Sequence, residues 1–319
     1  MLFDRPKIKL GISACLLGQE VRYNGGHQLD RYLRDTLGQY VEYVPVCPEV
    51  EAGYSTPREP FRLIGDPENP RLITVKTKVD HTQHMTRWSR KRADELAGED
   101  LCGFIFKSKS PSSGMERVKV YTEKGMPFKK GVGLFARAFM DRFPLLPVEE
   151  EGRLHDPILR ENFIVRIFAL GRWRELCAER KTRGGLVQYH ARHKLLLMSH
   201  SQAHLKKMGR LVARAKEMPP GELHGQYQDL LLEAMKLKAT RKKHVNVLQH
   251  IQGYFKRFLN ADEKQEICEI IEAYGRGDYP LVVPITLLNH YVRKYQDPYL
   301  EEQHYLQPHP MELKLRNHV

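Results

Sequence analysis

Short apolar runs of the kind that form buried strands occur mainly in the first half of the chain, where they alternate with helical stretches. The strand-like runs cover residues 9–13, 41–46, 101–106 and 118–122, and helical spacing occurs over 29–37, 81–97 and 133–142. Alternation of this kind predicts an α/β domain with a mostly parallel, Rossmann-like sheet flanked by helices.

Strand patterns nearly disappear after about residue 150. Helical spacing instead covers residues 160–173, 186–216, 221–237, 241–258, 261–274 and 284–295, with Pro and Gly between the stretches. We therefore predict an all-α C-terminal domain. The charged stretch 148–152 is the expected boundary, which gives domains of residues 1–150 and 151–319.

The net charge of +13 is unevenly distributed along the 319 residues. Residues 1–150 carry 24 Lys and Arg against 20 Asp and Glu, and the remainder carries 28 against 19. A phosphorylated ligand or RNA suits this excess, and a solvated basic surface explains it equally well. No apolar run approaches the roughly 20 residues needed to span a membrane. The first 18 residues also lack a signal-peptide pattern, so we expect a cytoplasmic protein.

Polar segments follow three of the predicted strands. Residues 13–18, which include Cys15, follow the first strand. Cys47 and Glu49 follow the second strand, and the serine-rich segment 107–114 follows the third. Because the carboxyl ends of parallel strands meet at one edge, we expect these groups to face a common cleft. Paired thiols suit an iron–sulfur cluster or zinc, and a carboxylate suits proton transfer. Two unrelated buried thiols are the alternative interpretation.

These segments, together with residues 21–27, 57–60 and 118–121, resemble the TudS thiouracil desulfidase family over about residues 7–145. The second half, including the His- and Arg-rich residues 189–194, resembles the YbgA-type domain of unknown function over about residues 160–310.

The resemblance implies a 4Fe–4S cluster held by three cysteines. One iron is left open for the sulfur of a thiolated base such as 2-thiouracil or a 4-thiouridine nucleotide, and water replaces that sulfur on the ring. By position, Cys15 and Cys47 correspond to cluster ligands. Glu49 corresponds to the catalytic acid or base, and Ser110 to a serine that assists proton transfer or positions the substrate.

The chain departs from the family pattern at the third cysteine, where it has Ser113. A hydroxyl is a harder ligand of higher pKa than a thiol and holds such clusters poorly. Three interpretations remain open: Ser113 binds iron as an alkoxide, an engineered change removed the ligand, or the lineage lost the cluster and kept a cleft for nucleotides or RNA. A sulfide or persulfide carrier using Cys15 or Cys47 is a further alternative.

Two more groups of residues are candidates for binding. An anionic or polar substrate is expected to meet Arg22, Arg58, Arg62, Lys107 and Ser112, although ordinary ion pairing also explains the basic residues. In the helical half, one stripe within an arc of roughly 80° comprises His190, His193, His200 and His204. A structural or interdomain role, a nucleic-acid contact and a metal site are all compatible with this stripe.

Overall fold

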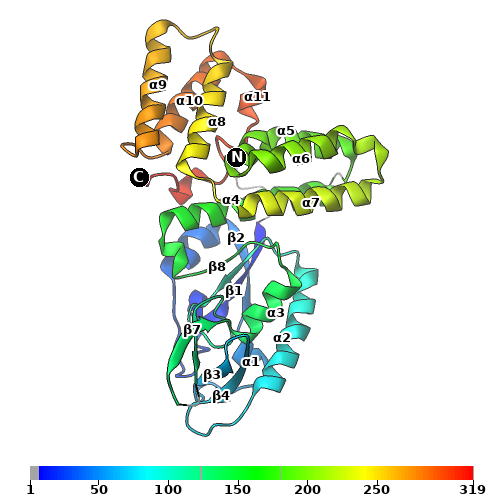
Figure 1. Cartoon of the computed structure of the whole chain (residues 1–319), viewed down its shortest axis with the longest axis vertical. Helices are drawn as coiled ribbons and strands as arrows, with labels where there is room; N and C mark the ends of the chain where they lie inside the picture. The colour runs from blue at the N-terminus through cyan, green and yellow to red at the C-terminus, as the bar shows by residue number, and fades with distance from the viewer. Residues whose placement is uncertain (1–6, 123, 180, 319) are drawn as a thin grey trace. The chain divides into compact units, whose positions relative to one another are not determined.

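The computed structural model describes residues 7–122, 124–179 and 181–318. The chain divides into two compact units, Met1–Phe163 and Ile164–Val319. The first is an α/β unit and the second is helical (Figure 1), which confirms the predicted fold class. Within the described residues, no helix combines the length and the apolar character needed to cross a membrane.

The main sheet of the first unit is parallel throughout. Its strand order is β2-β1-β5-β8, with β1 at Ile8–Ser13, β2 at Val41–Val46, β5 at Phe104–Phe106 and β8 at Val148–Glu150. Gly11 in β1 makes room for the ring of Phe104, since a Cβ at this glycine would lie 2.2 Å from that ring. Helices α2 (Thr82–Leu96) and α3 (Leu134–Arg142) contribute Leu96, Phe135 and Phe139 to the same core.

A second sheet differs from the prediction. It has the order β4-β3-β6-β7, with β3 at Phe61–Asp66, β4 at Asn69–Thr74, β6 at Val118–Tyr121 and β7 at Pro127–Gly131. The run at 118–122 was expected in the main parallel sheet, but β6 pairs antiparallel with β7 and parallel with β3. Only Val118 and Val120 of β6 are buried, so one face of this strand packs on Leu63, Leu72 and Met85. This one-sided burial is typical of strands in partly antiparallel sheets.

The charged stretch expected to link the two domains forms part of the main sheet. Its residues 148–150 are strand β8, which pairs with β5 through Phe106 and Glu150, and both glutamates of the strand are buried. The chain then passes through a short 3₁₀ turn, η5 (Arg153–His155), into α4 (Pro157–Glu179). The division between the units falls within α4.

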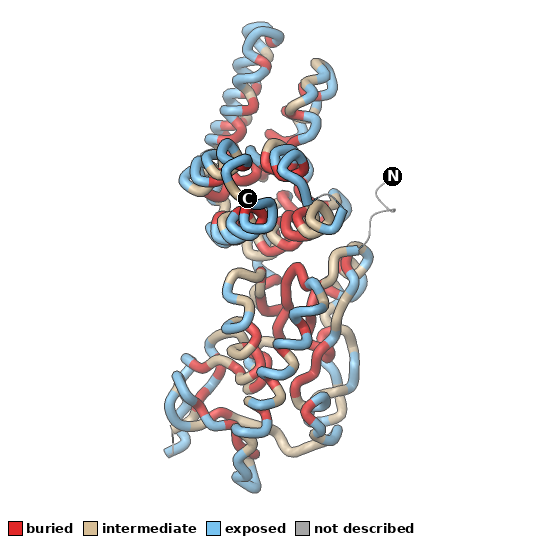
Figure 2. The backbone as a smooth tube through the Cα atoms, turned by 90° about the vertical axis from the view of Figure 1, so that its right-hand side faces the viewer, coloured by how far each residue is buried: buried red, intermediate tan, exposed pale blue. Residues whose placement is uncertain are grey.

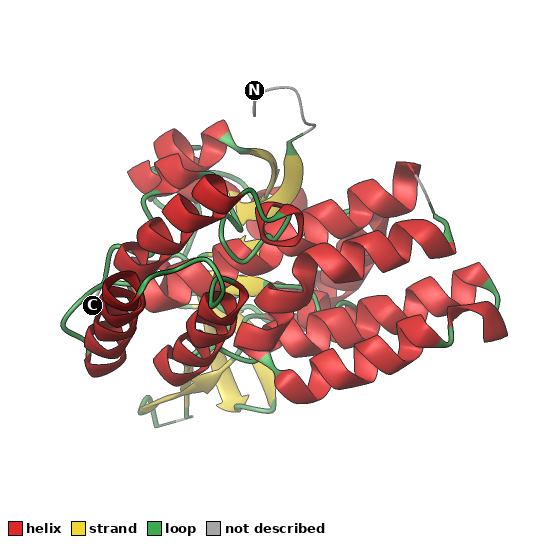
Figure 3. Cartoon of the chain, turned by 90° about the horizontal axis from the view of Figure 1, so that it is seen from above, coloured by secondary structure: helices red, strands yellow, loops and turns green. Residues whose placement is uncertain are grey.

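The second unit is built from helices joined by short loops (Figure 3). After α4 come α5 (Arg183–His200), α6 (Gln202–Ala213), α7 (Pro220–Lys236), α8 (Arg241–Tyr254), α9 (Ala261–Arg276), α10 (Val282–Tyr295) and α11 (Pro298–Glu301). Buried and exposed stretches alternate along the helices (Figure 2), as amphipathic helices require. Trp173 and Tyr227 are among its largest fully buried side chains.

One predicted helix is in fact two. The stretch 186–216 was expected to be continuous, but the chain leaves helical geometry at Ser201, where φ is −159° and ψ is 111°. The Ser201 hydroxyl then accepts a hydrogen bond from the His204 backbone N–H and caps α6. A serine at this position starts a new helix because its side chain replaces a missing intrahelical acceptor.

Candidate functional site

The site is built at the carboxyl edge of the main sheet, as predicted. Strand β1 ends at Ser13 and leads into the 3₁₀ turn Ala14–Leu17, which contains Cys15. Strand β2 ends at Val46, and Cys47 is the N-cap of the short helix α1 (Pro48–Glu51). Strand β5 leads into Lys107, whose backbone N–H donates to the Ser13 hydroxyl at 2.9 Å. That hydrogen bond joins two of the three strand ends.

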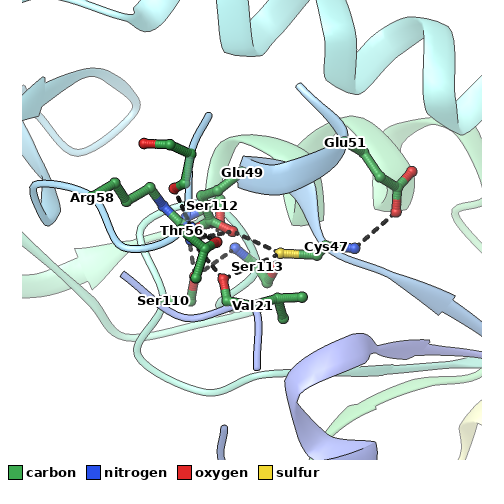
Figure 4. Close-up of polar contacts among 10 residues, drawn as sticks. Val21, Cys47, Glu49, Glu51, Thr56, Arg58, Ser110, Ser112 and Ser113 are labelled. Atoms are coloured by element: carbon green, nitrogen blue, oxygen red, sulfur yellow. Dashed lines mark hydrogen bonds and ion pairs between the residues drawn. The ribbon is translucent and has the colours of Figure 1, made fainter. Parts of the chain in front are cut away.

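Glu49 is the centre of this polar cluster (Figure 4). One carboxylate oxygen, Oε1, accepts a 2.5 Å hydrogen bond from the hydroxyl of Ser112. The other, Oε2, lies 3.6 Å from the sulfur of Cys47 and 3.8 Å from the Arg58 guanidinium. A carboxylate, a thiol, a hydroxyl and a guanidinium from three separate segments therefore meet within hydrogen-bonding or ion-pairing distance.

The serines of segment 107–114 form a directed chain of hydrogen bonds. The Ser110 hydroxyl oxygen accepts from the backbone N–H groups of Ser112 and Ser113, at 3.3 and 3.1 Å. It lies 3.0 Å from the Ser112 hydroxyl, whose single proton is donated to Glu49. The Ser110 hydroxyl must therefore donate to that of Ser112, because each hydroxyl has only one proton. The chain runs from Ser110 through Ser112 to Glu49.

Cys15 and Cys47 are both buried near the same cluster. Burial raises the pKa of Cys15 to about 11, while the positive charge of Lys107 opposes this shift. Burial, with the negative charge of Glu49, raises the pKa of Cys47 to about 12. Both thiols are therefore protonated at neutral pH unless a metal displaces the proton.

Comparisons with known proteins match the two halves of the chain separately. A family model described as 2-thiouracil desulfurase matches residues 10–151, and one described as a protein of unknown function (DUF1722) matches residues 194–310. The uncharacterized protein YbgA of Escherichia coli (strain K12) is 34% identical over 158 residues, which cover 49% of this chain and 94% of YbgA. The chain joins the 2-thiouracil desulfurase family to the YbgA-type DUF1722 family. This fusion is the one predicted from the motifs.

Two further matches each cover part of the chain. The uncharacterized protein YbbK of Bacillus subtilis (strain 168) is 32% identical over 108 residues, which cover 32% of this chain and 71% of YbbK. A solved structure of a 4Fe–4S-dependent thiouracil desulfidase, TudS, is 28% identical, with a TM-score of 0.39. That match covers 47% of this chain and 95% of the TudS chain.

The donor atoms around Glu49 do not fit a cluster held by three cysteines. Cys15 and Cys47 supply two thiols, and the third family position is the buried Ser113, which is 3% exposed. Among the described residues, no group of three His, Cys, Asp or Glu side chains is arranged to hold a metal ion. Cys102 offers no substitute, since its backbone N–H bonds to Lys9 near the start of β1, away from the strand ends that carry the site. The site is one thiolate short of the set that the family resemblance implies.

The basic residues expected at the site have different surroundings. Arg58 has an 8% exposed side chain and donates to the carbonyls of Val21 and Ser55, so it ties neighbouring loops together beside Glu49. Lys107 is ion-paired with Glu151. Arg22 acts electrostatically on Cys15, as Lys107 does.

Arg62 lies elsewhere in the first unit. It belongs to β3 of the second sheet, and its guanidinium carbon is 5.4 Å from the centre of the Tyr121 ring. The structure thus gathers Arg22, Arg58 and Lys107 near Glu49 or the cysteines, and places Arg62 on another sheet.

The histidine stripe of the YbgA-type unit does not form one continuous face. His190, His193 and His200 belong to α5, but His204 follows the break at Ser201 and belongs to α6. The prediction of one stripe on a single helix is therefore wrong for His204. Each imidazole has its own neighbour: Nδ1 of His190 lies 3.1 Å from the Tyr227 hydroxyl, while that of His200 lies 2.7 Å from the Leu237 carbonyl.

His193 and His204 are also engaged locally. His193 Nδ1 lies 2.8 Å from the Tyr189 carbonyl, and its Nε2 accepts from Arg172 at 3.0 Å. His204 Nδ1 lies 2.9 Å from the Ser201 hydroxyl. These contacts account for the stripe as part of the helical packing.

Sequence reasoning missed the acidic residues that support the site. Glu149, Glu150 and Glu151 were interpreted as part of a linker, yet all three are buried. Glu149 and Glu150 belong to the three-residue strand β8, and Glu151 follows it. In the sequence, a run of three glutamates in a solvated linker cannot be told from such a run at the end of a strand.

Proposed function

We propose that the N-terminal unit desulfidates thiolated pyrimidines of the 2-thiouracil or 4-thiouridine nucleotide type. In this reaction the C=S bond of the ring is replaced by C=O. Water supplies the oxygen, and the sulfur leaves with both protons of that water as hydrogen sulfide. Membership of the 2-thiouracil desulfurase family supports the reaction class. The observation that carries the proposal is the position of Glu49 between a cysteine thiol and a chain of serine hydroxyls.

Glu49 is the proposed proton-transfer group. Its carboxylate is mostly buried, with 14% of the side chain exposed, and Arg58 beside it balances its charge. A general base must lie within hydrogen-bonding reach of the proton that it moves, and the Ser112 hydroxyl fixes the direction of the carboxylate. Glu49 would take a proton from the attacking water and return it to the departing sulfur.

A 4Fe–4S cluster would supply a soft Lewis acid that binds the sulfur, as the family resemblance implies. Because Ser113 replaces the third thiol, we derive no step through such a cluster. The same substitution favours a second candidate function, in which a cluster-free cleft binds a pyrimidine nucleotide or RNA without turnover.

The helical unit has a surface feature that suits the second candidate. Phe258 is 57% exposed and Tyr254 is 37% exposed, and each stacks on a ring from the end of α10 or from α11. The exposed Lys256 and Arg257 lie between them in the sequence. Exposed aromatic rings beside cationic side chains suit single-stranded nucleic acid, because bases stack on the rings and phosphates pair with the cations.

Anaerobic reconstitution with iron and sulfide tests the two candidates. Wild type and Ser113→Cys are incubated with 2-thiouracil, 4-thiouridine monophosphate and a 4-thiouridine-containing RNA oligonucleotide. We expect sulfide release and loss of the thiocarbonyl absorbance, with greater iron retention in Ser113→Cys. If both proteins are colourless and neither releases sulfide from any of the three substrates, the desulfidase proposal is wrong. Salt-sensitive binding of the oligonucleotide would then support the second function.

A further inference from the structure

Three consecutive glutamates at the end of strand β8 are buried. Glu149 and Glu150 belong to the strand, and Glu151 follows it. Glu149, Glu150 and Glu151 are 8%, 6% and 8% exposed. An ionised carboxylate removed from water is strongly unfavourable unless donors surround it. The donors around each glutamate therefore show what offsets the burial of its carboxylate. The three glutamates have different donors.

Glu151 holds the beginning of the serine-rich segment. Its Oε2 accepts a 2.7 Å hydrogen bond from the backbone N–H of Ser108, and its Oε1 accepts another of 2.7 Å from the Ser108 hydroxyl. The ammonium of Lys107 is ion-paired with the same carboxylate. Charge-assisted hydrogen bonds are roughly twice as strong as neutral ones, so this end of the segment is firmly held.

Glu150 holds the other end. Its Oε1 accepts from the backbone N–H of Met115 at 2.7 Å and from that of Glu116 at 3.4 Å. Two adjacent side chains thus fix both ends of residues 108–115, the part of the chain that contains Ser110 and Ser112. Glu149 differs, since it accepts from the Arg153 guanidinium at 2.5 Å.

The segment between these two contacts is tightly wound. Lys109 has a positive φ of 61°, and a Cβ at Gly114 would lie 2.8 Å from the carbonyl oxygen of Ser110. The hydrogen bond from Ser112 to Glu49 is 2.5 Å long. A displacement of the segment by about 1 Å therefore brings this contact to the limit of a hydrogen bond.

We propose that Glu150 and Glu151 are positioning residues that set where the serine chain stands against Glu49, and that Glu151 also holds the Lys107 ammonium at the strand edge beside Cys15. The effect on turnover rests on the proposed desulfidase function. The effect on the segment itself does not, since every contact that carries it lies within the chain.

Amide hydrogen exchange of the whole 319-residue chain, prepared without iron, tests this inference directly. Residues 107–116 are followed by mass spectrometry in wild type, Glu150→Gln, Glu151→Gln and the matched control Glu149→Gln. Loss of a charged acceptor weakens its hydrogen bonds by about 1.4 kcal/mol, which corresponds to about tenfold faster exchange. We expect this acceleration in Glu150→Gln and Glu151→Gln but not in Glu149→Gln.

A milder variant covers the case in which a glutamine variant does not fold. Ser108→Ala removes the hydroxyl that donates to Glu151 and accepts from the Lys107 ammonium, but it leaves the Glu151 carboxylate in place. It should accelerate exchange near residue 108 by a few fold. Exchange in 107–116 that is unchanged in all folded variants, or equally faster in Glu149→Gln, would overturn the inference.

Kinetics provide the second measurement. With a substrate that the wild type desulfidates, Glu151→Gln should lower kcat about tenfold or more and change KM by less, because the serine chain that it positions acts on the proton-transfer group Glu49. Equal changes in kcat and KM, or an unchanged kcat, would contradict a positioning role. If exchange accelerates while even the wild type shows no turnover, the positioning role stands and the proposed function fails.

Discussion

Buried polar side chains are organised differently in the two units of the chain. In the desulfurase unit, Cys47, Glu49, Ser112 and Arg58 come from three separate segments and meet at one edge of a parallel sheet. In the YbgA-type unit, His193 and His200 are also buried, and each has its Nδ1 beside a backbone carbonyl, while Arg172 donates to Nε2 of His193. Burial of a titratable group therefore does not identify a site, whereas convergence of chemically complementary groups does.

The largest predicted effect tests the convergent cluster at its centre. Glu49→Gln keeps the shape of the side chain but removes its capacity to accept a proton. Turnover of a thiolated pyrimidine should fall by about a hundredfold to ten-thousandfold, the range typical of a general acid or base. Steady-state kinetics measure this loss, and an unchanged melting temperature shows that the fold is intact. Wild-type activity in Glu49→Gln would remove the reason to treat this cluster as catalytic.

A smaller loss is expected one step along the serine chain. Ser112→Ala removes the 2.5 Å donor to Glu49. A hydrogen bond to a charged group contributes about 1.5–3 kcal/mol, so kcat should fall by about tenfold to a hundredfold. Ser110→Ala acts one hydroxyl further from the carboxylate, and its effect should be smaller. A larger loss in Ser110→Ala than in Ser112→Ala would contradict the direction of the chain.

The helical unit should respond to pH through its histidines. Burial lowers the pKa of His190, His200 and His309 to about 4 in each case. The unfolded chain binds these protons near pH 6.5, so their contribution to stability is complete above that value and is lost as the pH falls toward 4. At pH 5.5 the loss is about 1.4 kcal/mol per histidine.

Fluorescence can follow this unit separately. The chain has two tryptophans, Trp88 and Trp173, and only Trp173 lies in the helical unit. In a Trp88→Phe protein, urea unfolding followed by Trp173 fluorescence should give a clearly lower midpoint at pH 5.5 than at pH 7.5. Replacing His200 with Phe should reduce this difference. A midpoint that does not change with pH would show that the histidines are not buried in their neutral form.

The smallest effect is expected at Arg62. This residue was predicted to contact substrate, but it lies on β3 against Tyr121. Arg62→Gln should therefore leave kcat/KM within about twofold of wild type, since its guanidinium lies over the Tyr121 ring of the second sheet. A tenfold rise in KM would place the substrate, or part of it, over the second sheet.

The sequence indicated the three strand ends of the site because each polar segment follows an apolar run. Strands β3, β4, β7 and β8 were missed. Two of them lack an apolar run, because β7 is exposed at every residue except Gly131 and β8 contains two glutamates. The contact between Ser112 and Glu49 joins residues 63 positions apart and depends on the winding of a loop. No local pattern encodes such a contact. The prediction of a single histidine stripe was wrong because Ser201 ends the helix that was assumed to carry all four histidines.

In the proposed reaction, the polar groups around Glu49 replace the ring sulfur by oxygen from water. Reconstituted wild type and the matched control Glu49→Gln are incubated with 2-thiouracil in oxygen-18-labelled water. The mass of the product is then measured by mass spectrometry. We expect uracil that carries one labelled oxygen atom, together with sulfide, from wild type, and little or none of either from Glu49→Gln. Unlabelled uracil, or labelled uracil formed equally by both proteins, would contradict it.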